Sequence, residues 1–221
     1  MLKYKSRLIG IFGGTFDPIH YGHLRVAEDI VRTVGLKKLY FVPAGIPRLR
    51  TAPEALPQHR VEIVRLVIQN NPNFILDERE IYRDGVSSSI DSMREFKQEF
   101  GGEVNLCFVL GIDAFIKFAE WDNWKEFFNL CHLIISTRPG YICTSINDLL
   151  PKELKEECSQ RWVINADDMK NHTNGLIFIS STTMLDISAT SIRKNIVTGK
   201  SVRGLVPDVA INYISDNKLY L

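Results

Sequence analysis

Short apolar runs alternate with longer segments of helical periodicity along this chain of 221 residues. The apolar runs have the length and the branched or aromatic side chains that are typical of buried strands. They lie at Leu8–Phe12, Leu39–Val42, Phe74–Leu76, Val104–Leu110, Leu133–Ser136 and Leu176–Ile179. Between them, apolar residues recur every three or four positions, which predicts amphipathic helices. These helices are expected at residues 24–34, His59–Gln69, Ile90–Phe100, Ser188–Val197 and Asp208–Ser215.

This alternation predicts an α/β fold: a doubly wound, Rossmann-like parallel sheet of about six strands, with helices on both faces and helices at the C-terminal end. One domain over residues 1–221 is expected. Parallel sheets bind ligands beyond the carboxyl ends of their strands, so Gly13-Gly14, Pro43, Gly111 and Arg138 should share one rim. In residues 141–175 only Glu153–Arg161 has helical character, so this segment is interpreted as an insertion or subdomain.

Composition narrows the classes of function. The chain is 45% hydrophobic and 24% charged, with a net charge of +1, as in ordinary soluble globular proteins. The chain lacks the strong positive charge that would predict binding to nucleic acid or to a membrane surface, so any anion site must be local. The basic N-terminal residues precede an apolar run too short for a signal peptide. The four cysteines, at 107, 131, 143 and 158, form no Cys-x-x-Cys pair and are expected to be buried free thiols, which favours the cytoplasm.

A glycine turn follows the first predicted strand and precedes two histidines, His20 and His23. Gly13-Gly14 permits close approach of another group to the backbone. The turn lacks the patterns of the P-loop and of dinucleotide-binding loops. The histidines could cap or pack the helix, bind zinc, or donate hydrogen bonds to a polyphosphate. A zinc site would need further ligands, and only Asp17 is close in sequence.

A second polar cluster opens the helix predicted at Ser188–Val197. Ser188 is a natural N-cap residue, and Thr190, Ser191 and Arg193 occupy the first turns. A cation here opposes the helix dipole, so Arg193 is poorly placed unless it meets an anion such as a phosphate. The alternative is an ordinary surface helix capped by serine.

Together, the two segments resemble the HxGH nucleotidylyltransferase superfamily. Gly13-Gly-Thr-Phe-Asp-Pro-Ile-His20-Tyr-Gly-His23 carries the signature, and Ile187-Ser-Ala-Thr-Ser-Ile-Arg193 is similar to the second motif. Over nearly its full length the chain resembles the bacterial nicotinate-nucleotide adenylyltransferases. Further matching segments are Val42–Pro47, Leu76–Glu80, Gly111–Asp113, Trp121, Arg138–Tyr141 and Leu205–Val209.

This resemblance implies transfer of AMP from ATP to nicotinate mononucleotide, giving deamido-NAD and pyrophosphate. It implies that His20, His23 and Arg193 are catalytic, and that Mg²⁺ is carried mainly by ATP, with no metal site in the protein. The implied ATP contacts are Gly13, Gly14, Thr15, Phe16, His20, His23, Gly111, Asp113, Ile187, Ser188, Thr190, Ser191 and Arg193. The implied mononucleotide contacts are Arg48, Arg50, Ser87, Ser89, Trp121, Asp122 and Arg138, with Trp121 stacked on the pyridine ring. Whether the protein is a homo-oligomer is left open.

The chain departs from the family at the acceptor end. The family commonly has Pro-Pro-His-Lys where this chain has Pro47-Arg-Leu-Arg50, and Ser-Tyr-Thr where it has Ser87-Ser-Ser89. The resemblance also implies that backbone N–H groups near Trp121 bind the nicotinate carboxylate, and Asp122 places a negative charge beside them. Two alternatives therefore stay open: an adenylyltransferase for nicotinamide mononucleotide or another phosphate-bearing acceptor, and a non-catalytic ATP-sensing module. The presence of both histidines and of Arg193 argues against the non-catalytic module.

Overall fold

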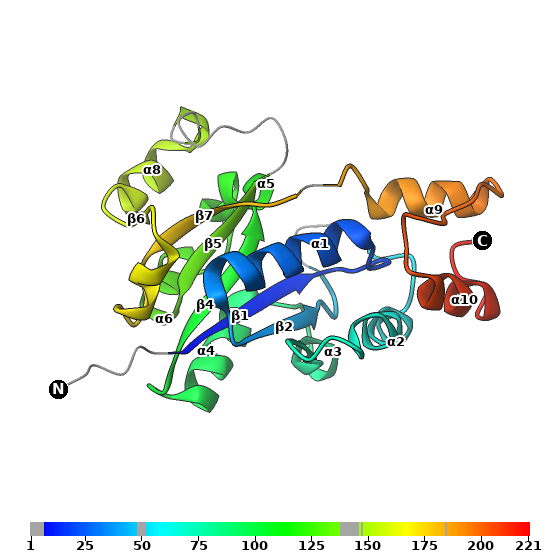
Figure 1. The fold of residues 1–221 in the computed structure, drawn as a ribbon, viewed down its shortest axis with the longest axis horizontal. Coiled ribbons are helices and arrows are strands. Elements are labelled where there is room, and N and C mark those ends of the chain that lie inside the picture. The colour runs from blue at the N-terminus through cyan, green and yellow to red at the C-terminus, as the bar shows by residue number, and fades with distance from the viewer. Residues whose placement is uncertain (1–6, 48–51, 138–145, 147, 184) are drawn as a thin grey trace.

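A parallel sheet with helices on both faces forms the centre of the molecule (Figure 1). The computed structural model describes residues 7–47, 52–137, 146, 148–183 and 185–221. Within these residues the sheet has seven strands, in the order β3-β2-β1-β4-β5-β7-β6. Their bounds are β1 Arg7–Gly14, β2 Lys38–Pro43, β3 Phe74–Leu76, β4 Val104–Gly111, β5 His132–Thr137, β6 Trp162–Val163 and β7 Ile177–Ser181.

Most helices lie between strands in the chain, and the last two follow the final strand. The longer ones are α1 Tyr21–Ile30, α2 Pro57–Ile68, α4 Ser89–Phe100, α8 Lys152–Cys158, α9 Ala189–Val197 and α10 Asp208–Asp216. Shorter ones are α3 Arg79–Tyr82, α5 Ile112–Ile116 and α6 Phe127–Leu130. A π-helical turn at Val31–Gly35 continues α1, and 3₁₀ turns lie at Phe118–Glu120, Trp124–Glu126 and Ala166–Lys170. No described helix is long and apolar enough to cross a lipid bilayer.

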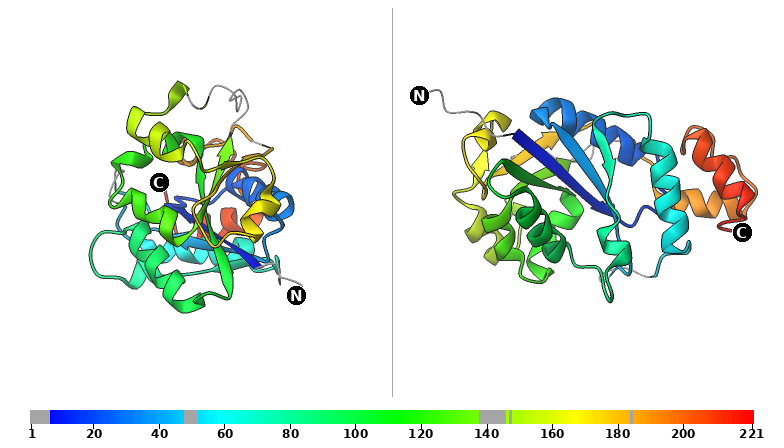
Figure 2. Two further views of the ribbon diagram at one scale, coloured as in Figure 1. Left: turned by 90° about the vertical axis from the view of Figure 1, so that its left-hand side faces the viewer. Right: turned by 90° about the horizontal axis from the view of Figure 1, so that it is seen from below.

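Strand alternation divides the apolar side chains between two cores. In β1, Leu8 and Phe12 join the core under α1, α2, α9 and α10. Ile9 and Ile11 join the opposite core under α4, α5, α6 and α8. Viewed along the sheet, α1 lies on one side and α4 on the other (Figure 2, left). This arrangement confirms the predicted doubly wound α/β fold.

The chain winds away from the middle of the sheet in both directions, and this sets where a ligand can bind. β2 and β3 follow β1 to one edge, whereas β4, β5 and β7 build toward the other edge. β1 and β4 are neighbours, with Ile11 beside Phe108. The connections that follow their carboxyl ends lead to opposite faces of the sheet, to α1 and to α5. This leaves a crevice at the topological switch point, where open α/β sheets bind their ligands.

The six predicted strands are confirmed to within about two residues, but the predicted strand count was one too low. The missed strand is β6, which has two residues and lies within the segment interpreted as an insertion or subdomain. It pairs with β7 and so extends the same sheet, and the helix predicted at Glu153–Arg161 is α8. Two residues are too few to show a strand period, which is why the pattern did not reveal β6. Cys107, Cys131 and Cys158 are buried free thiols as expected, and Cys143 lies outside the described residues.

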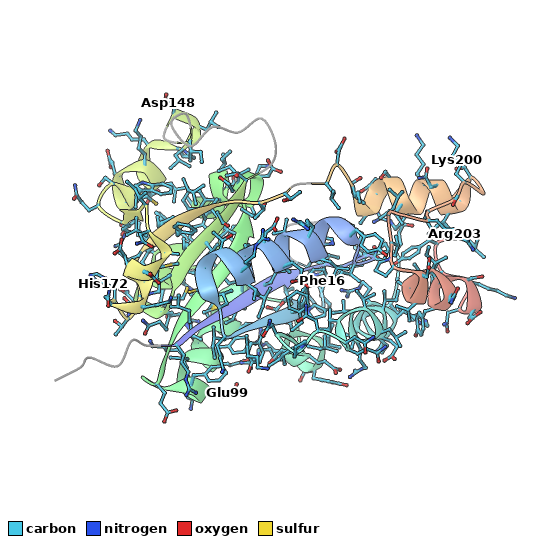
Figure 3. All side chains as sticks on the ribbon, in the orientation of Figure 1. Phe16, Glu99, Asp148, His172, Lys200 and Arg203 are labelled. Atoms are coloured by element: carbon cyan, nitrogen blue, oxygen red, sulfur yellow. The ribbon has the colours of Figure 1, made fainter. Side chains whose placement is uncertain are left out.

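A polar cluster is buried at the far end of the sheet from α9, around His132. Its Nδ1 accepts a hydrogen bond from Leu176 N at 3.2 Å, so Nε2 carries the proton and donates to the His172 carbonyl at 2.9 Å. A ring whose Nδ1 accepts a hydrogen bond is uncharged, and burial lowers the pKa of His132 from 6.5 to about 4. Figure 3 shows His172 at the opposite end of the molecule from Lys200 and Arg203, which lie by α9 and α10. This cluster is therefore structural and remote from the crevice.

Candidate active site

A cavity of about 660 Å³ lies at the carboxyl ends of the central strands, in the crevice between β1 and β4. Most of the residues predicted for a nucleotide site lie on its wall, although they come from distant parts of the chain. These are Gly13, Gly14, Thr15, Phe16, His20, His23, Ser87, Ser89, Gly111, Asp113, Trp121, Asp122, Ile187, Ser188, Thr190 and Arg193. Its volume is in the range of small-molecule binding sites. The fold thus brings the two sequence motifs together at one cavity.

The turn after β1 is shaped by Gly14 and Phe16. Phe16 has a φ of 49° and a buried ring that packs edge-on against Phe12 and His23. A Cβ at Gly14 would lie 2.8 Å from that ring, so only glycine fits there. Because the Phe16 side chain turns into the core (labelled in Figure 3), the turn offers its backbone to the cavity.

His20 and His23 lie at the start of α1, as predicted. His20 is the N-cap residue, and its ring stacks on that of His23 with 3.7 Å between the centroids. Gly22 permits this arrangement, because a Cβ there would lie 2.9 Å from Nδ1 of His20. The pattern His-x-Gly-His thus places two imidazoles side by side on the cavity wall, where they can donate hydrogen bonds to an anion.

The first turn of α9 also lies on the cavity wall, and the residue before Ser188 is close to α1: a Cβ at Gly22 would lie 3.5 Å from the Ile187 carbonyl oxygen. Ser188 is its N-cap residue, as predicted, and its hydroxyl accepts a hydrogen bond from Ser191 N at 3.2 Å. The Ser191 hydroxyl donates to the Ser188 carbonyl at 2.9 Å, and Ser191 is not among the residues that line the cavity. Thr190 lines the cavity beside Ser188. The N-terminal ends of α1 and α9 therefore face one space, which favours an anion there.

Arg193, which the sequence predicts to need an anion beside it, lies next to two carboxylates of the protein. Its Nε donates to Oε1 of Glu54 at 2.6 Å, and its Nη1 donates to the Asp17 carbonyl at 2.8 Å. Nη1 also lies 3.7 Å from the Asp17 carboxylate. These carboxylates compensate the unfavourable position of a cation near a helix start. Arg193 still reaches the cavity wall, so an incoming anion would compete with Glu54.

The other end of the cavity is aromatic and polar. Trp121 packs against Phe118 and Phe108, with ring centroids 5.3 and 6.1 Å away, while its remaining surface lines the cavity. It is thus both a core residue and a wall residue. The Ser87 hydroxyl accepts a hydrogen bond from Gly45 N at 2.7 Å and so joins the loop after β2 to the loop before α4. The predicted residues Arg48, Arg50 and Arg138 lie outside the described residues.

Glu80 is a charged residue of the cavity wall that was not predicted to take part in the site. Glu80, in α3, is buried on the cavity wall and accepts a hydrogen bond from Ser92 Oγ at 2.7 Å. Burial raises the pKa of Glu80 above its ordinary value. A helix of four residues is too short to show a hydrophobic period, so the sequence pattern did not indicate that Glu80 is buried. Its position in the segment Leu76–Glu80, which matches the family, was the one available signal.

A network of buried charged and polar groups under the cavity was also missed. Asp17 is 4% exposed, and its carboxylate accepts hydrogen bonds from Glu54 N at 2.8 Å and Ala55 N at 3.2 Å. Arg60, in α2, is fully buried and donates to the carbonyls of Thr15 at 2.7 Å and Gly45 at 3.0 Å. Burial lowers the pKa of Arg60, and the nearby Asp17 opposes that shift. Arg60 thus joins the loops after β1 and β2 to α2.

Comparison with known proteins agrees with this geometry. Residues 11–195 match the model of the cytidylyltransferase-like family. A probable nicotinate-nucleotide adenylyltransferase of Halorhodospira halophila is 41% identical over 207 residues, which is 94% of this chain and 92% of that protein. One of Klebsiella pneumoniae is 36% identical and covers 97% of this chain and 98% of its own.

A similar fold occurs in a solved structure of a distant protein. The nicotinic acid mononucleotide adenylyltransferase of Plasmodium falciparum, solved in complex with NaAD, superposes with a TM-score of 0.73 over 97% of both chains. Its sequence is 20% identical, so this likeness concerns the fold.

Proposed function

The chain belongs to the nicotinate-nucleotide adenylyltransferases within the cytidylyltransferase-like family, and we propose that it transfers AMP from ATP to nicotinate mononucleotide in NAD biosynthesis. The products are deamido-NAD (nicotinate adenine dinucleotide) and pyrophosphate. One observation carries the proposal: His20 and His23 at the start of α1, and Arg193 in α9, line a single cavity at the switch point of the sheet. Cations and helix N-termini that converge in this way suit a triphosphate.

The reaction needs positioning more than covalent chemistry. An oxygen of the mononucleotide phosphate attacks the α-phosphorus of ATP, the new P–O bond forms, and the bond to the pyrophosphate breaks on the opposite side. Backbone N–H groups of Gly14–Phe16 hold the nucleotide beside β1. His20 and His23 donate hydrogen bonds to the charge that develops at the α-phosphate. Ser188, Thr190 and Arg193 hold the β and γ phosphates and stabilise the departing pyrophosphate.

Magnesium would enter with the nucleotide. No group of three or more His, Cys, Asp or Glu side chains is placed to hold a metal ion in the part of the chain that the structure describes. Mg²⁺ keeps several waters and is bound largely by phosphate oxygens in such sites, so it would need few ligands from the protein. When bound, the ion neutralises charge on the phosphates.

The acceptor would occupy the aromatic end of the cavity. Trp121, Ser87 and Ser89 line this part of the cavity, so the pyridine ring can stack on Trp121 and the serine hydroxyls can bind polar groups of the acceptor. Asp113, after β4, is suited to a ribose hydroxyl. We assign the mononucleotide to this end because the phosphate-binding groups gather at the other.

A product analysis with several acceptors tests the proposal. The purified protein is incubated with ATP and Mg²⁺, separately with nicotinate mononucleotide, nicotinamide mononucleotide, phosphopantetheine and no acceptor, and the products are resolved chromatographically. Equal amounts of deamido-NAD and pyrophosphate with nicotinate mononucleotide are expected. A preference for another acceptor would reassign the substrate, and ATP binding without product would favour the sensing module. A His20→Ala/His23→Ala variant purified in the same way controls for contaminating enzyme.

A further inference from the structure

Tyr220, which follows α10, contacts a residue of the cavity wall near the expected phosphate-binding groups. Tyr220 is 7% exposed, and its hydroxyl donates to Oδ1 of Asp17 at 2.8 Å. In Figure 1 the chain end marked C lies between α9 and α10. Tyr220 does not line the cavity, whereas Asp17 does. The hydrogen bond to Asp17 therefore links Tyr220 to the cavity wall.

The Asp17 carboxylate is the point where three segments meet. It receives Tyr220 from the chain after α10 and the backbone N–H groups of Glu54 and Ala55 from the loop before α2. It also lies 3.7 Å from Nη1 of Arg193. The same Nη1 donates to the Asp17 carbonyl at 2.8 Å, so the position of Asp17 sets the position of the guanidinium.

The backbone at Tyr220 is in an unfavourable conformation that serves this contact. Its φ is 63°, a left-handed value that costs free energy for a residue other than glycine. Lys218 also has a positive φ, but there the cause is local, because residues 218 and 219 close the end of α10 with hydrogen bonds to Ser215 and Ile214. No such helix-end bond involves Tyr220 among the described contacts. Its conformation instead allows the hydrogen bond between its hydroxyl and Asp17.

We propose that Tyr220 is a positioning residue for AMP transfer: its hydroxyl fixes the Asp17 carboxylate, and Asp17 fixes Arg193 toward the triphosphate. This inference rests on the proposed function of the cavity. Without the hydroxyl, Asp17 keeps its backbone donors but loses its one side-chain hydroxyl donor in the described structure. The carboxylate can then move toward Arg193 and draw the guanidinium away from the phosphates.

The test compares two tyrosines that differ in their partner. Tyr220→Phe keeps the ring and removes the hydrogen bond to Asp17. Tyr213→Phe is the matched control, because Tyr213 lies in α10 and its hydroxyl meets His59 Nδ1 at 3.0 Å, away from the cavity. Tyr220→Phe is expected to lower kcat/KM for ATP about tenfold, the size typical of one lost hydrogen bond to a charged group. KM for the acceptor is expected to stay within about twofold of wild type, and Tyr213→Phe is expected to change neither constant.

A double-mutant cycle separates positioning from general support of the fold. In an Asp17→Asn background, Tyr220→Phe should have little further effect on kcat/KM for ATP, because the carboxylate that links Tyr220 to Arg193 is already altered. Additive losses, or an unchanged Tyr220→Phe enzyme, would overturn the inference. If Tyr220→Phe folds poorly, as judged by circular dichroism, Tyr220→Leu takes its place, because it also lacks the hydroxyl and adds no bulk to this buried site. A kcat/KM for ATP equal to that of the wild type would then count against the inference. Inactive wild-type protein would contradict the proposed function instead.

Discussion

The ion pair between Glu54 and Arg193 predicts that a carboxylate competes with ATP for the guanidinium. Glu54→Gln keeps the shape of the side chain and removes its charge. In the present structure Oε1 of Glu54 lies 2.6 Å from Nε of Arg193, which is the contact that a phosphate oxygen would take. The substitution should therefore strengthen ATP binding, although it removes an ion pair from the free protein.

The size of the effect follows from the exposure of the pair. The Glu54 side chain is 53% exposed and that of Arg193 is 19% exposed. Pairs that reach solvent contribute at most about 1 kcal/mol, because water screens them. Release of Arg193 from that pair, with removal of one negative charge near the triphosphate, should lower Kd for ATP about threefold to fivefold. The gain should shrink at high ionic strength.

Calorimetric titration of the purified protein with ATP measures this change. Glu62→Gln is the matched control, because Glu62 pairs with Arg65 at 3.0 Å, is 39% exposed, and does not line the cavity. It should leave Kd for ATP unchanged. Equal or weaker ATP binding by Glu54→Gln would refute the reasoning, since it would mean that Glu54 supports Arg193 instead of competing for it.

Three further predictions concern other parts of the structure. His20→Ala and His23→Ala should each lower kcat by about 100-fold or more while KM for the mononucleotide changes little, because these groups act on the transition state; steady-state kinetics with unchanged turnover would remove them from the mechanism. Trp121→Ala should raise KM for the mononucleotide about tenfold through loss of stacking, and Trp121→Phe should raise it less; an unchanged KM in both would place the pyridine ring elsewhere. The pKa of His132 is lowered by burial from 6.5 to about 4, so the folded state binds fewer protons than the unfolded state between these values. Its stabilising contribution is full above pH 6.5 and is lost as the pH falls toward 4, by up to about 3 kcal/mol. Chemical denaturation of His132→Gln should show a flatter loss of stability over this range, and an identical pH profile would contradict the assignment.

The pattern of apolar residues was sufficient for the architecture because it reports burial. The strands from β1 to β5 and β7 are apolar runs bounded by turn residues, and each was predicted. The rule that parallel strands bind ligands at their carboxyl ends then placed Gly13, Gly111 and their neighbours on one rim, which is where the cavity lies.

The groups that hold the site together could not be predicted in the same way. Arg60 lies among apolar residues of an amphipathic helix, where a charged residue is normally taken to face solvent. Its burial depends on the carbonyls of Thr15 and Gly45, which are distant in sequence. Tyr220 meets Asp17 through a contact between opposite ends of the chain, and local periodicity contains no information on such a pair. The sequence likewise could not show that Glu54 is an anion that meets Arg193, because Glu54 comes from another segment.

The stereochemical course at the α-phosphorus tests the central claim most directly. The claim is that AMP passes from ATP to the mononucleotide in one in-line step within the cavity, with no protein nucleophile. The protein is supplied with ATP that carries a single sulfur of defined configuration on the α-phosphate, together with nicotinate mononucleotide, and the thio-substituted dinucleotide is analysed by ³¹P NMR. One displacement inverts the configuration, and two successive displacements restore it. The account predicts inversion; retention, which would require an adenylylated protein intermediate, would contradict it.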